Sequence, residues 1–136
     1  QFPKGNGPLE GIMTCLHHSD KPFNLIVACD MHYLKGSFLT RFYRQLRSGM
    51  NVLVPFWQGD LQPLCAFYHK AMLYPFHQFE AEDLFKLKHI LCQVHATSLT
   101  IDSKVPGYHR NLFANINTPK EYYQMNHYEN QCVIFW

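Results

Sequence analysis

The sequence lacks the short motifs that identify several large enzyme classes. It contains no glycine-rich phosphate loop, no GxSxG segment around a nucleophilic serine and no HExxH zinc helix. Its cysteines are odd in number and widely spaced, at Cys15, Cys29, Cys65, Cys92 and Cys132. This spacing suits neither a zinc site nor a disulfide framework, so we expect reduced and mostly buried thiols.

Long apolar runs and concentrated charge are missing as well. No segment has the length of a membrane span, and no signal peptide is recognisable. Twelve Lys and Arg against ten Asp and Glu give a net charge of +2, and the basic residues are scattered along the chain. This distribution lacks the basic patch that nucleic-acid binding requires. We therefore expect a soluble cytoplasmic protein with no nucleic acid or membrane as partner.

What is present is the composition of one globular domain. The chain has 136 residues, of which 47% are apolar. That is enough for one hydrophobic core and too little for two domains of ordinary size. We expect a single domain over residues 1–136.

Apolar spacing alternates between the helical and the strand pattern along the chain. It predicts helices over 8–16 and 37–47, strands over 25–29, 51–55 and 62–68, two helices within 71–91 separated at Pro75, and a strand within 94–101. The strands over 51–55 and 62–68 have the spacing of a hairpin, with a turn at 57–60. The pattern predicts an α/β fold whose mostly parallel sheet is mixed.

The most informative stretch runs from Asn24 to Leu34. The apolar residues 25–29 show no alternation and lead directly into Asp30, which predicts a strand buried on both faces with a carboxylate at its end. In α/β sheets the carboxyl ends of central strands open into the ligand crevice. Asp30 could hold a magnesium ion there or cap the next helix, and the spacing alone favours neither.

Other local signals concern helix ends. Gly7 and Pro8 are suited to the start of the first helix, where an anion can bind, although an ordinary loop-to-helix junction explains them equally well. Ser37 is an expected N-cap, and Ser48–Gly49 the expected end of the same helix, whose exposed face carries Arg41, Arg44 and Arg47. The apolar tail 132–136 can pack or form a strand.

Four separated segments together resemble one family, the molybdenum cofactor guanylyltransferases. They are Gly7–Gly11 (GPLEG), Val27–Met31 (VACDM), Gln62–Leu64 (QPL) and Phe113–Pro119 (FANINTP), in the order and spacing of the family. The resemblance covers nearly the whole chain. It implies a Rossmann-like, three-layer α/β/α nucleotidyltransferase fold and the transfer of GMP from GTP to molybdopterin. GTP and molybdopterin would be the substrates, with molybdoenzyme chaperones or other cofactor-biosynthesis proteins as candidate partners.

The resemblance also implies roles at the matched positions. Asp30 would be the catalytic residue that holds Mg²⁺ between the nucleotide phosphates. Gly7, Pro8, Leu9 and Gly11 would join it in binding the nucleotide. Gln62, Pro63, Asn115 and Asn117 would contact the pterin or its phosphate. As a strand, the two asparagines would point the same way, but asparagines before a helix are also ordinary turn residues.

The chain departs from the family pattern at two places. His32 stands where the family usually has proline, and the family's glycine-rich opening segment with its lysine is not found in these residues. We expect the chain to correspond to the carboxyl-terminal two-thirds of such an enzyme and not to turn over GTP alone. The alternatives are a cytidylyl or other nucleotidyltransferase, and a non-catalytic remnant that binds pterin or nucleotide.

Overall fold

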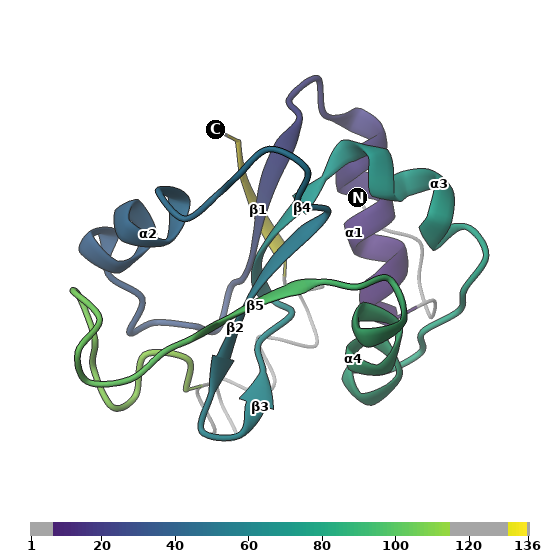
Figure 1. Cartoon of the computed structure of the whole chain (residues 1–136). Coiled ribbons are helices and arrows are strands. Elements are labelled where there is room, and N and C mark those ends of the chain that lie inside the picture. Colours follow the sequence, from purple (N-terminus) through teal and green to yellow (C-terminus); the bar gives the residue numbers. More distant parts are fainter. Residues whose placement is uncertain (1–6, 115–130, 136) are drawn as a thin grey trace.

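The computed structural model describes residues 7–114 and 131–135 (Figure 1). Helices and strands are interspersed along the described chain, which confirms the predicted α/β class. The elements are α1 (Gly7–His18), β1 (Phe23–Ala28), α2 (Gly36–Tyr43), β2 (Val52–Trp57), β3 (Asp60–Leu61), β4 (Cys65–His69), η1 (Lys70–Met72), α3 (Leu73–Phe76), α4 (Leu84–Gln93), β5 (Thr97–Thr100) and β6 (Gln131–Phe135).

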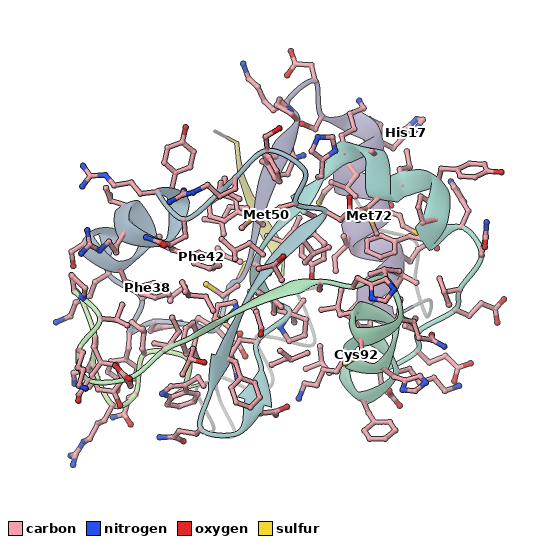
Figure 2. The ribbon with its side chains drawn as sticks, viewed as in Figure 1. His17, Phe38, Phe42, Met50, Met72 and Cys92 are labelled. Atoms are coloured by element: carbon pink, nitrogen blue, oxygen red, sulfur yellow. The ribbon has the colours of Figure 1, made fainter. Side chains whose placement is uncertain are left out.

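Helices cover both faces of the central sheet. The helices α1, α3 and α4 lie on one face, and α2 lies on the other together with the loop that follows β5 (Figure 1). Figure 2 shows Phe38 and Phe42 of α2 on the opposite side of the sheet from Met72. The domain therefore has the three layers that the resemblance implied.

Each face has its own hydrophobic core, and consecutive strand residues enter different cores. In β1, Leu25 belongs to the core under α2, whereas Ile26 belongs to the core under α1. In β4, Phe67 and Tyr68 divide in the same way. Because side chains alternate between the two faces of a strand, a strand covered on both sides has no polar face. This explains the unbroken apolar run that ends at Asp30.

The sheet is mixed, with the strand order β3-β2-β4-β1-β6 and β5 beside β2. The strands β1, β2 and β5 run in one direction, but β4 lies between β1 and β2 and is antiparallel to both. Among the described residues the one parallel pairing is β2 with β5. The sheet is mixed as predicted, but the expectation that it is mostly parallel was wrong, because antiparallel pairings predominate. The short connection from β2 to β4 cannot form a parallel crossover, so β4 runs back between β1 and β2.

The predicted hairpin and tail are now defined. Gln58 and Gly59 both have positive φ, 51° and 79°, and they form a two-residue turn that pairs Trp57 with Asp60. The predicted strand within 94–101 is β5. The apolar tail forms β6, which pairs with β1.

The predictions of helix ends over 37–47 were wrong at both ends. Lys35 is the N-cap of α2 and has no side-chain cap bond, so Ser37 is not the cap. The helix ends at Tyr43, before the expected Ser48–Gly49. Its last carbonyls accept backbone N–H groups in a tighter turn, as in the bond from the Gln45 N–H to the Phe42 carbonyl oxygen at 3.0 Å. Beyond the helix, the Arg47 side chain donates from Nη1 to the carbonyl oxygens of Arg44 and Leu46. The three arginines are exposed, as predicted.

Pro75 does not separate the two helices as expected, because it lies in the first turn of the short helix α3, where proline is tolerated. The break follows Phe76, and α4 begins at an N-cap, Asp83, whose carboxylate accepts the Lys86 N–H at 2.9 Å. In the described part of the chain, no helix combines the length and the apolar character needed to cross a membrane.

Candidate functional site

The candidate site lies at the edge of the sheet where β1 and β2 end. This is the lower edge in Figure 1, next to the β2–β3 hairpin, and the amino-terminal end of α1 lies on the same side. Strands β1 and β2 run in the same direction, so their carboxyl ends meet there. Helix α1 carries the first predicted nucleotide-binding residues to this edge, and β1 carries Asp30.

Asp30 occupies the turn directly after β1 and is only 6% exposed. The Met31 N–H closes this turn on the Ala28 carbonyl oxygen at 3.3 Å. The helix-cap alternative is wrong, because the next helix begins several residues later with Lys35 as its N-cap. Neither of the two salt bridges among the described residues involves Asp30. A carboxylate that is largely removed from water is costly without a cation, so the position suits a cation ligand.

The chemistry of the surroundings limits what kind of metal could bind. In the described ranges, no group of three or more His, Cys, Asp or Glu side chains is placed to hold a metal ion. A protein cage of the zinc or calcium type is therefore not formed by these residues. A single carboxylate fits a hard cation that takes its remaining oxygens from water and substrate phosphates.

The turn containing Gln62 and Pro63 lies beside Asp30. The Ala28 N–H donates to the Leu64 carbonyl oxygen at 2.8 Å, so the end of β1 is joined to this turn. Pro63 is buried, and its carbonyl oxygen accepts a hydrogen bond of 2.6 Å from the Tyr68 hydroxyl. Burial raises the pKa of Tyr68, so this hydroxyl remains a donor. Pro63 thus has a structural role in shaping the turn.

Gln62 is half-buried and remains the polar side chain of this turn. Its backbone N–H donates to the Pro55 carbonyl oxygen at 2.9 Å, and its side-chain amide makes a long contact of 3.4 Å with the Asp60 carbonyl oxygen. The backbone is thus fixed between β2 and β4, while the amide is held only weakly. The structure brings Gln62 and Pro63 to the same edge as Asp30, and their contact with a substrate stays a prediction.

The first turn of α1 carries Gly7, Pro8, Leu9 and Gly11, and packing explains two of them. Gly7 has a φ of 76°, and a Cβ there would come within 2.3 Å of the Ala81 carbonyl oxygen. The side chain of Leu9 is 2% exposed and belongs to the core under α1. Gly11 is buried and Pro8 is half-buried. Nucleotide binding by this turn stays a prediction, and it would use backbone N–H groups that a first helical turn leaves unpaired.

Asn115 and Asn117 lie outside the described residues, as does the rest of the segment up to Pro119. Their predicted contact with the pterin or phosphates stays a prediction. The described chain reaches Ala114, whose N–H donates to the Asn111 carbonyl oxygen at 2.9 Å. The preceding Leu112 and Phe113 are buried in the core under α2.

Two of the four described cysteines, Cys29 and Cys92, are exposed, so the expectation of mostly buried thiols holds only for Cys15 and Cys65. Cys65 is fully buried, and burial raises the pKa of its thiol to about 12. It is therefore an inert thiol, as expected. Cys29 is exposed instead, because β1 ends at Ala28 and residue 29 already belongs to the turn.

Sequence reasoning missed an aromatic pair beside Asp30. The rings of Tyr33, which follows the Asp30 turn, and His109, which lies in the loop after β5, are stacked with centroids 5.6 Å apart and planes inclined by 6°. The position of Tyr33 shortly after Asp30 was the available signal. The partner could not be found from the sequence because the contact is made by distant segments.

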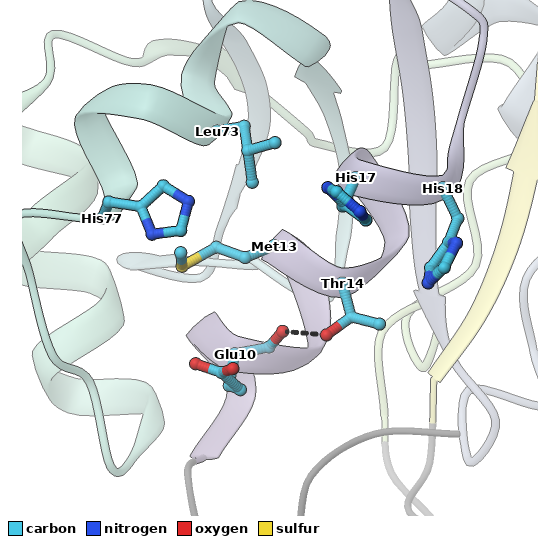
Figure 3. A pocket seen from close by; sticks show the side chains of 7 residues that line it. All are labelled: Glu10, Met13, Thr14, His17, His18, Leu73 and His77. Atoms are coloured by element: carbon cyan, nitrogen blue, oxygen red, sulfur yellow. Dashed lines mark hydrogen bonds between the residues drawn. The ribbon is translucent and has the colours of Figure 1, made fainter.

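A separate pocket lies between α1 and α3 (Figure 3). It has a volume of about 240 Å³ and is lined by Glu10, Met13, Thr14, His17, His18, Leu73 and His77. The Thr14 hydroxyl donates to the Glu10 carbonyl oxygen at 2.9 Å within the helix. None of the predicted site residues lines this pocket.

A three-layer α/β/α domain with a carboxylate at the carboxyl end of a central strand has the architecture of the nucleotide-binding α/β proteins. The family model described as the MobA-like NTP transferase domain matches residues 1–96. The chain belongs to this family, which confirms the resemblance found in the sequence. The family is thus one of nucleotidyltransferases.

Similar proteins agree with this assignment. A protein of Bacillus cytotoxicus named probable molybdenum cofactor guanylyltransferase is 25% identical over 124 residues, covering 91% of this chain and 61% of the relative. A Clostridium perfringens protein with the same name is 37% identical over 67 residues, covering 49% of this chain and 33% of the relative. The first two relatives are spanned over 61% and 60% of their own length.

Two crystal structures share the fold. Molybdopterin-guanine dinucleotide biosynthesis protein A from Archaeoglobus fulgidus matches with a TM-score of 0.61 and 23% identity, over 89% of this chain and 62% of that chain. A protein from Aquifex aeolicus matches with a TM-score of 0.66 and 18% identity, over 82% of this chain and 57% of that chain. These likenesses support the three-layer nucleotidyltransferase fold.

Proposed function

We propose that this chain forms the metal side and the acceptor side of a guanylyltransferase that transfers GMP from GTP to molybdopterin. The observation that carries the proposal is the nearly buried Asp30 at the carboxyl end of β1, beside the turn of Gln62 and Pro63. The relatives that span most of the chain are named for this activity. We place the reaction in the cytoplasm, with molybdoenzyme chaperones as candidate protein partners.

Asp30 would hold a magnesium ion together with phosphate oxygens of GTP. The carboxylate fits this role because Mg²⁺ prefers oxygen ligands and is usually held by one or two carboxylates plus substrate phosphates. When bound, the ion would neutralise the charge that develops around the α-phosphate. The Asp30 turn is fixed at both sides, by the Ala28 contact to Leu64 and by its own closing hydrogen bond, so the carboxylate needs little rearrangement.

The reaction is a substitution at phosphorus that needs no protein nucleophile. A phosphate oxygen of the pterin attacks the α-phosphorus of GTP, and the bond to the leaving pyrophosphate breaks. Cys65, the buried thiol of β4, stays neutral because burial raises its pKa, so it cannot compete as a nucleophile. Gln62, Asn115 and Asn117 would orient the acceptor through neutral hydrogen bonds.

The test uses the full-length protein that contains this chain. We expect Asp30→Asn to lower magnesium-dependent GMP transfer by about a hundredfold or more, the size typical of losing one electrostatic stabiliser of a transition state. Asp60→Asn is the matched control, because Asp60 is exposed and its salt bridge to Lys88 lies on the hairpin surface. Retained activity in Asp30→Asn would contradict the metal role.

The same assay with GTP and CTP in parallel decides which base is used. Preference for CTP would replace the guanylyl assignment by the cytidylyl alternative. Absence of any transfer by the full-length protein, with pterin or nucleotide binding retained, would favour the binding remnant. The expectation that residues 1–136 alone do not turn over GTP stays a prediction, and measurable transfer by them would contradict it.

A further inference from the structure

The stacked pair of Tyr33 and His109 presents an aromatic surface next to the candidate site. Tyr33 is 47% exposed, although one face of its ring packs on the half-buried His109. The two planes differ by only 6°, which is the parallel, offset arrangement that a further flat ring can extend. An exposed tyrosine in this geometry therefore offers its second face to a planar molecule.

His109 is held in place before any ligand arrives. Its Nδ1 accepts the backbone N–H of Asn111 at 3.1 Å, and its carbonyl oxygen accepts the Leu112 N–H at 2.8 Å. Because Nδ1 is used as an acceptor, the neutral ring carries its proton on Nε2 and keeps a donor at its other edge. The loop itself is fixed to α2 at Gly107, where a Cβ would lie 2.5 Å from the Phe38 nitrogen.

The position of the pair separates it from the nucleotide side. The predicted nucleotide-binding turn belongs to α1, which covers one face of the sheet, whereas the loop of His109 covers the other face together with α2 (Figure 1). Asp30 lies at the edge between the two faces. In the sequence, this loop is followed by Asn115 and Asn117, the residues expected on the acceptor side. A ring bound on Tyr33 would therefore belong to the acceptor.

We propose that Tyr33 and His109 form a stacking platform for the planar, nitrogen-rich pterin ring of the acceptor. This proposal rests on the proposed function, and it adds residues that bind the ring to those that bind phosphate. Stacking supplies the affinity, and Nε2–H of His109 supplies a donor for a ring acceptor atom. Tyr33 is thus a binding residue that takes no part in the transfer of the phosphoryl group.

The experiment measures binding of 6-hydroxymethylpterin, a fluorescent pterin without a phosphate, to the full-length protein. Stacking on Tyr33 should quench the fluorescence of the pterin. Tyr33→Ala should weaken the binding of the pterin by about tenfold or more. Tyr33→Phe keeps the flat ring and should bind within about twofold of the unchanged protein. Tyr74→Ala is the matched control, because Tyr74 is 77% exposed on α3 and lies on the other face.

Two outcomes would overturn the platform. One is unchanged affinity and quenching in Tyr33→Ala, and the other is the absence of pterin binding by the unchanged protein. If Tyr33 acted only by anchoring the loop, Tyr33→Leu would bind pterin as tightly as Tyr33→Phe does. The two variants would then differ only in melting temperature, which would be lower for Tyr33→Leu. GMP transfer is measured in the same samples to distinguish the two proposals. If Tyr33→Ala still transfers GMP and binds pterin with unchanged affinity, the stacking platform is contradicted and the proposed function is not.

Discussion

The two faces of the sheet are built on different plans. The face under α1, α3 and α4 has a mainly aliphatic core in which regular helices supply most of the covering side chains. The face under α2 is rich in phenylalanine, and one short helix and an irregular loop cover it. Large rings fill the volume that a second helix would otherwise occupy. The irregular cover brings His109 to Tyr33, so the less regular face is the one that carries the proposed stacking platform.

The largest expected effect comes from breaking the aromatic face at its centre. Phe38 is fully buried and packs against Phe42 and Phe113, with centroids 5.5 Å from each. We expect Phe38→Ala to lower the free energy of unfolding by about 3–5 kcal/mol, measured by urea denaturation. Leu16→Ala is the counterpart on the helical face and should cost about 2–5 kcal/mol. A loss below 1 kcal/mol in Phe38→Ala would show that the loop collapses onto the cavity.

A smaller effect is expected where the loop meets α2. Gly107 has a φ of 81°, and its added Cβ would meet the Phe38 nitrogen at 2.5 Å. We expect Gly107→Ala to cost roughly 2 kcal/mol from the left-handed backbone and the forced shift. Gly36→Ala is the control, since a Cβ there meets nothing within 4 Å. The two variants should separate clearly in thermal unfolding, and equal melting temperatures would mean that the loop is not fixed at Gly107.

Alkaline pH should distinguish the two cores through their thiols. The ordinary pKa of a cysteine thiol is 9.0. Burial raises the pKa of Cys65, in the core under α2, to about 12. It raises the pKa of Cys15, which points from α1 into the other core, to about 11. As the pH rises, each thiol loses its proton in the unfolded chain before it does so in the folded protein. The contribution of these buried thiols to the free energy of unfolding is therefore complete below pH 9 and declines as the pH rises above it. For Cys65 the loss is about 1.4 kcal/mol per pH unit up to pH 12.

Urea unfolding at several pH values under reducing conditions measures this slope. Cys65→Ala should make the decline above pH 9 shallower by one titrating group. Cys15→Ala should do the same over a narrower window that closes near pH 11. An unchanged slope in Cys65→Ala would mean that this thiol ionises in the folded protein as it does in the unfolded chain.

The smallest expected effect is at the start of α4, on the helical face. The Asp83 carboxylate accepts the Lys86 N–H at 2.9 Å. Asp83→Ala should lower stability by about 1 kcal/mol, whereas Asp83→Ser, which can still cap the helix, should lose much less. Thermal unfolding of the two variants tests this, and equal losses would assign the effect to charge instead of capping.

The regular face was the more predictable one. Leu9, Ile12 and Leu16 recur at helical spacing and are buried as that spacing predicts. Apolar residues at this spacing lie on one face of a helix, and that face is the one that packs against the core. The burial of β1 on both faces and the place of Asp30 at its end also followed from the sequence. Both features are local, since they depend on residues that are adjacent in the chain.

The remaining features depend on contacts between distant segments. The pairing of β2 with β4 was predicted as a hairpin, but the pairing of β4 with β1, which places β4 between them, has no local signature. The stack of Tyr33 on His109 depends on how the loop after β5 folds back. The need for glycine at position 7 also comes from a distant segment, because the backbone of residues 81 and 82 packs against it.

The pairing of β1 with both β4 and β6 has a consequence for how the protein is made. Residues 131–135 occupy one side of the strand that positions Asp30. During synthesis on the ribosome, that side of β1 stays without its partner until residues 131–135 have emerged. The unpaired strand edge is prone to association with other chains in the meantime. Strand β1, which leads to Asp30, therefore gains its second neighbour only after β4, its first neighbour, has long been made.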